Sequence, residues 1–248
     1  MAGHSKWANI KRRKGAQDAA RGKMFTKLIK EIQVAAKLGG GDLDANPRLR
    51  LAVDKAKGQS MPRNTIERAI EKATGEIGGD DYVELTYEGY GPGGVAILVA
   101  CLTNNRNRSA ADVKAVFNKM NASLGSPGSV AYQFQRKGQF RLSAEQIDED
   151  TVLMAALEGG GEEVVADDGD WLVTSPFEAY DSCKQQLEGL GIEVKAELTQ
   201  IPDTTISIST NEAVSLLKLL ERLEDLDDVQ ETYTNADFDE EALTALGE

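Results

Sequence analysis

The spacing of the apolar positions changes between residues 74 and 82. Before that point they recur only at the three- and four-residue intervals of helices, and after it segments with the two-residue period of strands appear between further helical segments. The order predicts a helical domain followed by domains that contain sheets. With 248 residues, the chain is long enough to form two or three compact units.

Three helices are predicted in the first 75 residues. The first spans residues 17–38 and ends at the glycine run that starts at Gly39. Asn46 and Pro47 have the positions of an N-cap and a first helical residue, and they open a second helix that runs to Lys57. A third helix covers residues 60–74. We therefore expect a basic N-terminal helical domain over residues 1–76.

The remaining chain predicts two α+β domains. Residues 137–201 give strands and helices in the order βαββαβ, which is the ferredoxin-like arrangement. Before this stretch, strands are predicted at residues 82–87, 94–103 and 129–135, with a turn at residues 88–93. The helix and strand after the stretch would leave a face uncovered on their own, so we expect them to complete the earlier sheet in one discontinuous domain from residues 80–136 and 202–236. The expected fold class is α+β and multidomain, with the ferredoxin-like domain inserted in the other. Residues 237–248 are expected to be an acidic tail.

Charge is divided unevenly along the chain. Residues 1–74 hold 17 Lys or Arg and 7 Asp or Glu, a net charge of +10, whereas residues 75–248 hold 11 and 34, a net charge of −23. Such a division indicates that the basic part contacts nucleic acid. A solvated surface without a ligand is the alternative.

One face of the first predicted helix is cationic. On a wheel of about 100° per residue, four lysines fall within an arc of roughly 80° opposite the apolar stripe. Nine cations accompany a single acid, Asp18, among the first 30 residues. A phosphate backbone would supply the counterions. Trp7 either stacks on a base or fixes this segment to the helices. The four lysines are Lys23, Lys27, Lys30 and Lys37; the predicted nucleic-acid-binding residues are Lys6, Trp7, Lys11, Arg12, Arg13, Lys14, Arg21, Lys23, Lys27 and Lys30.

A second candidate phosphate contact lies just before the helix predicted at residues 109–120. Arg106 and Arg108 belong to a polar run that begins at Asn104 in an otherwise acidic region. Arginines at a helix N-terminus can hold a phosphate. Asn and Ser at the same place can equally be helix caps.

The sequence offers no convincing catalytic or metal site. His4 is the only histidine, and the two cysteines have no metal-ligand spacing. The glycine run at residues 89–94 matches a dinucleotide fingerprint, but a strand follows it, which favours a hairpin turn. Likewise, residues 167–170 indicate a turn rather than a calcium loop. The acids at residues 221–228 are interpreted as a solvated face.

The composition and motifs of the sequence also indicate which class of protein to expect. The longest apolar run, residues 94–102, is shorter than the roughly 20 residues of a membrane span, and the first residues lack a secretory signal. We expect a non-enzymatic cytoplasmic protein without cofactors, membrane contact or a small-molecule substrate. The expected oligomeric state is a monomer or a weak oligomer.

Five motifs closely resemble the YebC/PmpR family over essentially the whole chain. They are MAGHSKWANIK at residues 1–11, KLGGG at 37–41, NPRLR at 46–50, YEGYGPGG at 87–94 and DDVQ at 227–230. The resemblance implies three domains, a helical bundle and two α+β domains, one inserted in the other. It also implies a regulator of gene expression, since bacterial members are named as transcriptional regulators and some are described as binding promoter DNA.

The resemblance leaves a second function open. Mitochondrial relatives are translational activators, and bacterial members have been linked to relief of ribosome stalling at proline runs. The cations are mostly Lys, which contacts phosphate more readily than it reads bases, and no helix-turn-helix is recognisable. The predicted third strand of the ferredoxin-like domain lacks the paired aromatics of an RNA-recognition motif, so we expect this acidic domain to be a scaffold or to contact protein. DNA, RNA and the ribosome all remain candidate partners.

Overall fold

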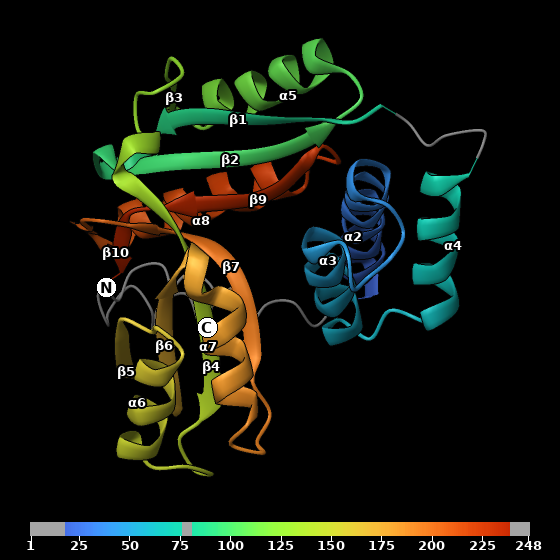
Figure 1. The fold of residues 1–248 in the computed structure, drawn as a ribbon. Coiled ribbons are helices and arrows are strands. Elements are labelled where there is room, and N and C mark those ends of the chain that lie inside the picture. The colour runs from blue at the N-terminus through green and yellow to red at the C-terminus, as the bar shows by residue number, and fades with distance from the viewer. Residues whose placement is uncertain (1–17, 76–80, 239–248) are drawn as a thin grey trace. The chain divides into compact units, whose positions relative to one another are not determined.

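The computed structural model describes residues 18–75 and 81–238, and side chains from residue 22 onward (Figure 1). The chain divides into two compact units, residues 1–133 with 204–248, and residues 134–203. The second unit interrupts the first in sequence. Among the described helices none has the length and apolarity needed to cross a membrane. The three-domain boundaries expected from the sequence stay a prediction.

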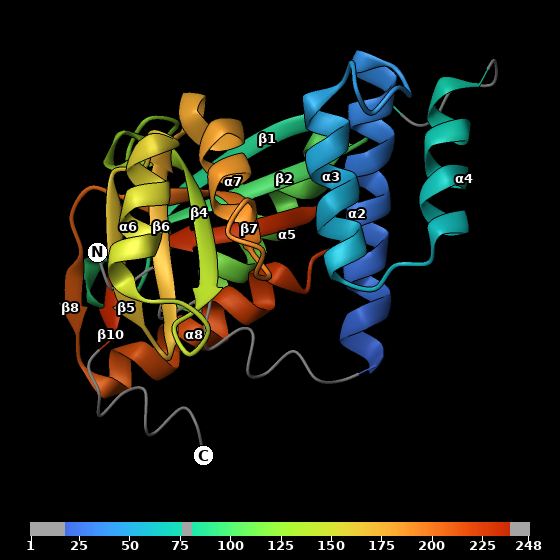
Figure 2. The same cartoon turned by 60° about the horizontal axis from the view of Figure 1, so that its bottom comes forward.

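Three helices form the beginning of the first unit: α2 (Asp18–Gly39), α3 (Pro47–Gly58) and α4 (Arg63–Thr74). They lie side by side in both views (Figures 1 and 2). Their shared core joins the α2 stripe around Ile32 to Leu49 of α3 and Ile66 of α4. The helical spacing of the apolar residues therefore predicted these helices correctly.

Asn46 ties the end of α2 to the start of α3. Its side-chain oxygen accepts a hydrogen bond from the backbone N–H of Leu49, as an N-cap does. Its amide nitrogen donates to the backbone oxygens of Ala35 and Gly40, both at 2.8 Å. Gly40 has φ +84°, and a Cβ on Gly39 would lie 2.6 Å from the Asn46 amide. Glycine is therefore required at both positions.

The first sheet has the strand order β3-β1-β2-β9. It consists of β1 (Val83–Tyr90), β2 (Ala96–Thr103), β3 (Ser123–Leu124) and β9 (Val229–Thr234), all antiparallel to their neighbours. Helices α5 (Arg106–Lys119) and α8 (Thr210–Glu224) pack on the face formed by the alternate residues Ile97, Val99 and Cys101. The C-terminal helix and strand thus complete the first sheet, as the sequence predicts.

Two local predictions in this unit are wrong. Residues 88–90, expected in a turn, continue β1, and the turn is a short 3-10 segment, Pro92–Gly94, with Gly93 at φ +73°. Residues 129–133, expected in a strand, form a loop and the 3-10 turn Ala131–Gln133. The buried Glu88 carboxylate explains this loop, because it accepts hydrogen bonds from the N–H groups of Gly128, Val130 and Ala131.

The second unit is a ferredoxin-like βαββαβ domain, which confirms the predicted fold class. Its sheet has the order β5-β6-β4-β7 with antiparallel neighbours. Phe140 of the sheet stacks on Tyr180 of the second helix, with ring centroids 5.3 Å apart. The elements are β4 (Phe134–Ser143), α6 (Glu149–Glu158), β5 (Glu163–Asp167), β6 (Asp170–Pro176), the 3-10 turn Phe177–Ala179, α7 (Tyr180–Glu188) and β7 (Lys195–Pro202).

A small parallel sheet was not predicted. It pairs β8 (Ile206–Ile208) with β10 (Ala236–Phe238) beside α8 (Figure 2). Phe238 is fully buried in the core of the first unit. Asp237 and Phe238 are therefore not part of a tail, and the rest of the expected acidic tail, residues 239–248, lies outside the described residues.

Candidate nucleic-acid interface

The cationic face of α2 contacts the acidic end of α8. We call residues 224–228, which connect α8 to β9, the acidic segment. Lys23 Nζ lies 2.8 Å from Asp225 Oδ1. Lys27 Nζ donates to the backbone oxygen of Glu224 at 2.7 Å, and Lys30 Nζ donates to that of Asp227 at 2.8 Å. Successive lysines one helical turn apart therefore meet successive groups of one acidic connection.

Two physical effects favour this contact. Lys27 binds a carbonyl at the C-terminus of α8, where the helix dipole attracts cations. Lys30, which is largely buried, is also 3.5 Å from Asp228 Oδ1 and lies over the ring of Tyr82, 5.8 Å from its centroid. These lysines are consequently held by the protein's own acids, carbonyls and an aromatic ring.

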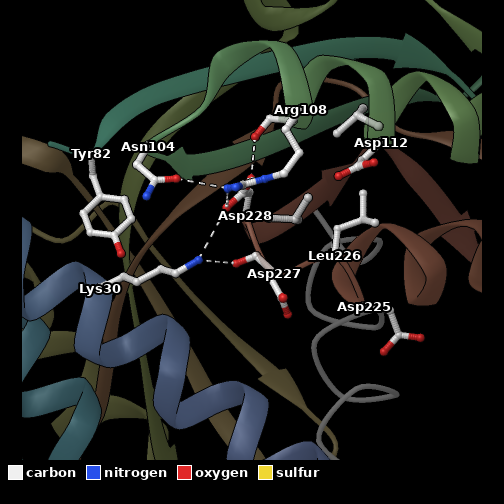
Figure 3. Close-up of a pocket in the computed structure, with 12 residues that line it drawn as sticks. Lys30, Tyr82, Asn104, Arg108, Asp112, Asp225, Leu226, Asp227 and Asp228 are labelled. Carbon is white, nitrogen blue, oxygen red and sulfur yellow. Dashed lines mark hydrogen bonds and ion pairs between the residues drawn. The ribbon is translucent and has the colours of Figure 1, made fainter. Parts of the chain in front are cut away.

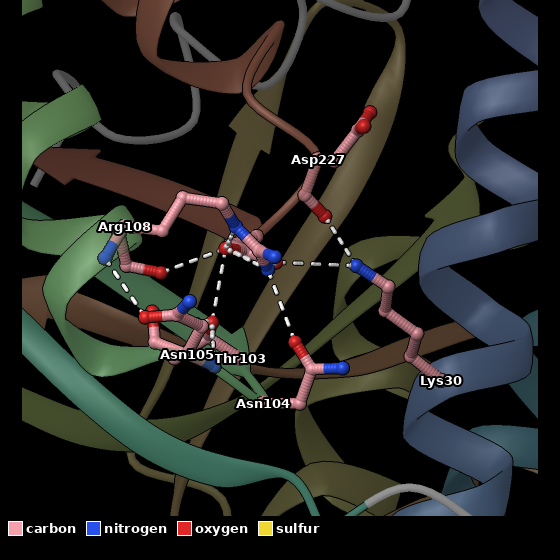
Figure 4. A network of polar contacts seen from close by, with 8 residues as sticks. Lys30, Thr103, Asn104, Asn105, Arg108 and Asp227 are labelled. Atoms are coloured by element: carbon pink, nitrogen blue, oxygen red, sulfur yellow. Dashed lines mark hydrogen bonds and ion pairs between the residues drawn. The ribbon is translucent and has the colours of Figure 1, made fainter.

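Asp228 is the centre of the polar network at this place (Figure 3). Figure 4 shows other members of the network, including Lys30, Thr103 and Arg108. The Asp228 carboxylate receives Arg108 Nη2 at 2.8 and 3.0 Å and Nε at 3.1 Å. Ser109 Oγ donates at 2.8 Å and Thr103 Oγ1 at 2.9 Å. The Asp228 side chain is only 8% exposed. A buried carboxylate with this many donors is a fully satisfied structural group.

The network also fixes the charge state of Asp228. Burial by itself would raise the pKa, but the hydrogen bonds from Arg108, Ser109 and Thr103 and the charge of Lys30 outweigh it, so the pKa of Asp228 lies below its ordinary value. Conversely, the bonds to Asp228 raise the pKa of Arg108. Both groups are ionised at neutral pH.

The two arginines of the second candidate phosphate contact, Arg106 and Arg108, have different surroundings in the structure. Asn105 is the N-cap of α5 and accepts the N–H of Arg108 at 3.1 Å, as the capping interpretation predicts. The Arg108 guanidinium is bound to Asp228, so a phosphate would have to compete with a buried carboxylate. Arg106 is exposed at the start of α5, and its contact with phosphate stays a prediction.

A polar cleft of about 450 Å³ lies beside this network. Its walls come from α2, the start of β1, α5 and the acidic segment (Figure 3). The labelled side chains that line it include both Lys30 and Asp112. The described residues hold no cluster of three or more side chains suited to a metal ion. The cleft therefore presents mixed charge rather than a metal site.

Other predicted contacts fall outside the structural description. The positions of Lys6, Trp7, Lys11, Arg12, Arg13 and Lys14 are not described, nor is the side chain of Arg21. Their contacts with nucleic acid stay predictions. Lys37, the last lysine of the cationic face, pairs with Asp81 at 2.6 Å.

The sequence interpretation missed the role of the acidic segment. It treated the acids at residues 221–228 as a solvated face, which is wrong for Asp228, because that side chain is buried. The sequence shows that Lys23, Lys27 and Lys30 recur once per helical turn and that residues 224–228 hold four acids around Leu226, but it does not specify that the two segments meet.

Sequence comparisons match nearly the whole chain to one family. Residues 5–76 match the TACO1/YebC protein N-terminal domain, and residues 82–236 match the TACO1/YebC second and third domain. A "probable transcriptional regulatory protein" of Desulforapulum autotrophicum is 51% identical over 99% of this chain and 100% of its own length. One of Pseudomonas fluorescens with the same description is 52% identical over the full length of both.

A solved structure has the same fold. The crystal structure of a conserved hypothetical protein from Aquifex aeolicus matches with a TM-score of 0.81 and 43% sequence identity. The match covers 90% of this chain and 93% of that one.

Proposed function

This chain belongs to the TACO1/YebC family, and from that premise we propose that it is a non-enzymatic, nucleic-acid-binding regulator of gene expression. The observation that carries the proposal is the net charge of +10 in residues 1–74. Relatives over the full length bear the description "probable transcriptional regulatory protein". The description of those relatives supports transcription as the regulated process, and DNA as the first partner to test.

We assign the main phosphate contacts to the basic N-terminal segment, residues 6–21. Lys23, Lys27 and Lys30 contact the acidic segment, so they can reach phosphate only by exchanging their present partners for it. The N-terminal segment adds six cations against one acid, Asp18. Electrostatic attraction to phosphate then supplies most of the affinity, with little dependence on base sequence.

The test is reversal of charge in the N-terminal segment. The variant Arg12→Glu, Arg13→Glu, Lys14→Glu is expected to weaken binding to duplex DNA and to structured RNA by at least about a hundredfold, because three phosphate attractions become repulsions. The matched control is Lys114→Glu, Lys195→Glu, Lys218→Glu, which changes the net charge equally at exposed lysines outside residues 1–74. Equal binding by the two variants would refute the assignment.

A role on RNA is the second candidate function. Apart from Arg21, the cations of α2 are lysines. Lysine contacts phosphate without reading base edges, and such contacts suit structured RNA as well as DNA. Cross-linking in cells, with bound DNA and RNA both sequenced, separates the two candidates. Enrichment of a few promoters supports transcriptional control, whereas enrichment of ribosomal RNA supports a translation factor.

A further inference from the structure

Helix α6 of the ferredoxin-like domain exposes apolar side chains. Val152, Ala155 and Ala156 form its inner face. Outside lie three large apolar residues, which we call the α6 stripe: Leu153, Met154 and Leu157, with exposures of 39%, 65% and 61%. Their spacing of one, three and four residues places them on one side of the helix.

Exposed apolar side chains are concentrated on α6 rather than scattered singly. The described residues contain nine exposed large hydrophobic side chains, and three of them belong to this single helix of ten residues. Isolated exposed apolar residues are ordinary, but adjacent ones on one helix face are typical of a surface that is covered by a partner.

The surroundings of the stripe are acidic. Residues 142–183 contain 12 Asp or Glu and no Lys or Arg. Asp150 and Glu158 are exposed on α6 itself. The next cation along the chain, Lys184 on the neighbouring helix α7, lies 3.8 Å from Glu188. A partner that covers the stripe must therefore bring positive charge beside apolar side chains.

Helix stability accounts for only some of these acids. Asp148 is the N-cap of α6, and acids in the first turn are favoured by the helix dipole. Glu158 lies at the C-terminal end, where the dipole disfavours an acid, and no basic residue occupies the last turn. Neither the helix dipole nor a basic residue of the last turn therefore favours Glu158, which is consistent with a role in recognition.

We propose that the α6 stripe and its flanking acids bind a basic amphipathic helix of a partner protein. Apolar side chains of that helix cover Met154 and Leu157, and its Lys or Arg residues pair with Asp150 and Glu158. This surface is independent of the proposed nucleic-acid contacts, which lie in residues 1–74.

The test uses a defined peptide probe. A labelled helical peptide of Leu and Lys with one apolar face is titrated into the full-length protein. Saturable binding is expected, and Met154→Gln with Leu157→Gln should weaken it about tenfold or more. The matched control is Leu38→Gln, since Leu38 is 74% exposed on another helix. The proposal is overturned if both variants bind like the wild type, or if a peptide of Leu and Glu binds equally well.

A photo-cross-linking residue at position 154 of the full chain identifies what covers the stripe in cells. The expected product joins position 154 to a segment of a different protein in which Lys or Arg flank apolar residues. A product with this chain's own residues, with a second copy of it, or no product at all contradicts the proposal. If the Met154→Gln, Leu157→Gln variant binds nucleic acid like the wild type, then the α6 stripe does not take part in nucleic-acid binding. The proposal for the stripe and the proposed function can then be tested separately.

Discussion

Helices α2 and α6 each bury one apolar side, but their outer faces differ. The outer face of α2 carries lysines that contact the acidic segment of the same unit. The outer face of α6 carries exposed apolar side chains with acids and no cations. The charge of a segment therefore indicates the class of its ligand, whereas pairing and exposure decide which of its side chains are available to bind that ligand.

Removal of the Asp228 carboxylate, which lies beside Lys30 of α2, should destabilise the protein strongly. Asp228→Ala removes the acceptor of Arg108, Ser109 and Thr103, and should lower the free energy of unfolding by about 3–5 kcal/mol. Urea denaturation measures it. The control Asp227→Ala should cost under about 0.5 kcal/mol, because its side chain is exposed and only its backbone oxygen binds Lys30. Equal losses would remove Asp228 from the centre of the network.

The apolar sides of the two helices can be compared in the same assay. Ile32→Ala on α2 should lower the free energy of unfolding by about 2–5 kcal/mol, since Ile32 is fully buried. Met154→Ala on α6 should change it by less than about 0.5 kcal/mol. A large loss for Met154→Ala would mean that the α6 stripe belongs to the protein's own core.

Lowering the pH should cause part of the loss of stability that is expected for Asp228→Ala. The pKa of Asp228 is lower in the folded protein than in the unfolded chain, so its stabilising contribution is present above the unfolded pKa of about 4. The contribution is lost as the pH falls from there through the folded pKa. The free energy of unfolding of the wild type should fall more steeply below pH 4 than that of Asp228→Asn. Parallel curves would contradict the assigned charge state.

Removal of a single charge beside the lysines of α2 should have a weaker effect than the changes above. Asp225→Asn removes the carboxylate charge beside Lys23 and should strengthen DNA binding about two- to fivefold, since one competing anion is lost. Asp168→Asn makes the same charge change in an exposed turn of the ferredoxin-like domain and serves as the control. Fluorescence anisotropy measures both. An equal gain in the two variants would reflect net charge alone, with no competition at Lys23.

The local part of the fold could be predicted from the sequence, and the long-range part could not. Apolar periodicity identified α2, and the Asn46-Pro47 pair located the start of α3. The strands β8 and β10 escaped detection because each has three residues and their pairing joins segments far apart in the chain. Gly89 suggested a turn, but it lies in a strand where a Cβ would come within 2.5 Å of Phe117.

The candidate site likewise has a local part that could be predicted from the sequence and a long-range part that could not. The lysine face of α2 was readable from the sequence, because helical spacing is a local property. Its partners lie about 200 residues away in the acidic segment. A single sequence does not specify which acids a basic face meets, so Asp228 was assigned to a solvated surface.

The salt dependence of nucleic-acid binding reports how many cations of the protein contact phosphate. If about four cations of the basic region contact phosphate, the logarithm of the association constant for duplex DNA should fall with the logarithm of salt concentration at a slope of about −3 to −4. The slope should become shallower by about 3 in the Arg12→Glu, Arg13→Glu, Lys14→Glu variant. A flat titration of the wild type, or an unchanged slope in the variant, would contradict the account.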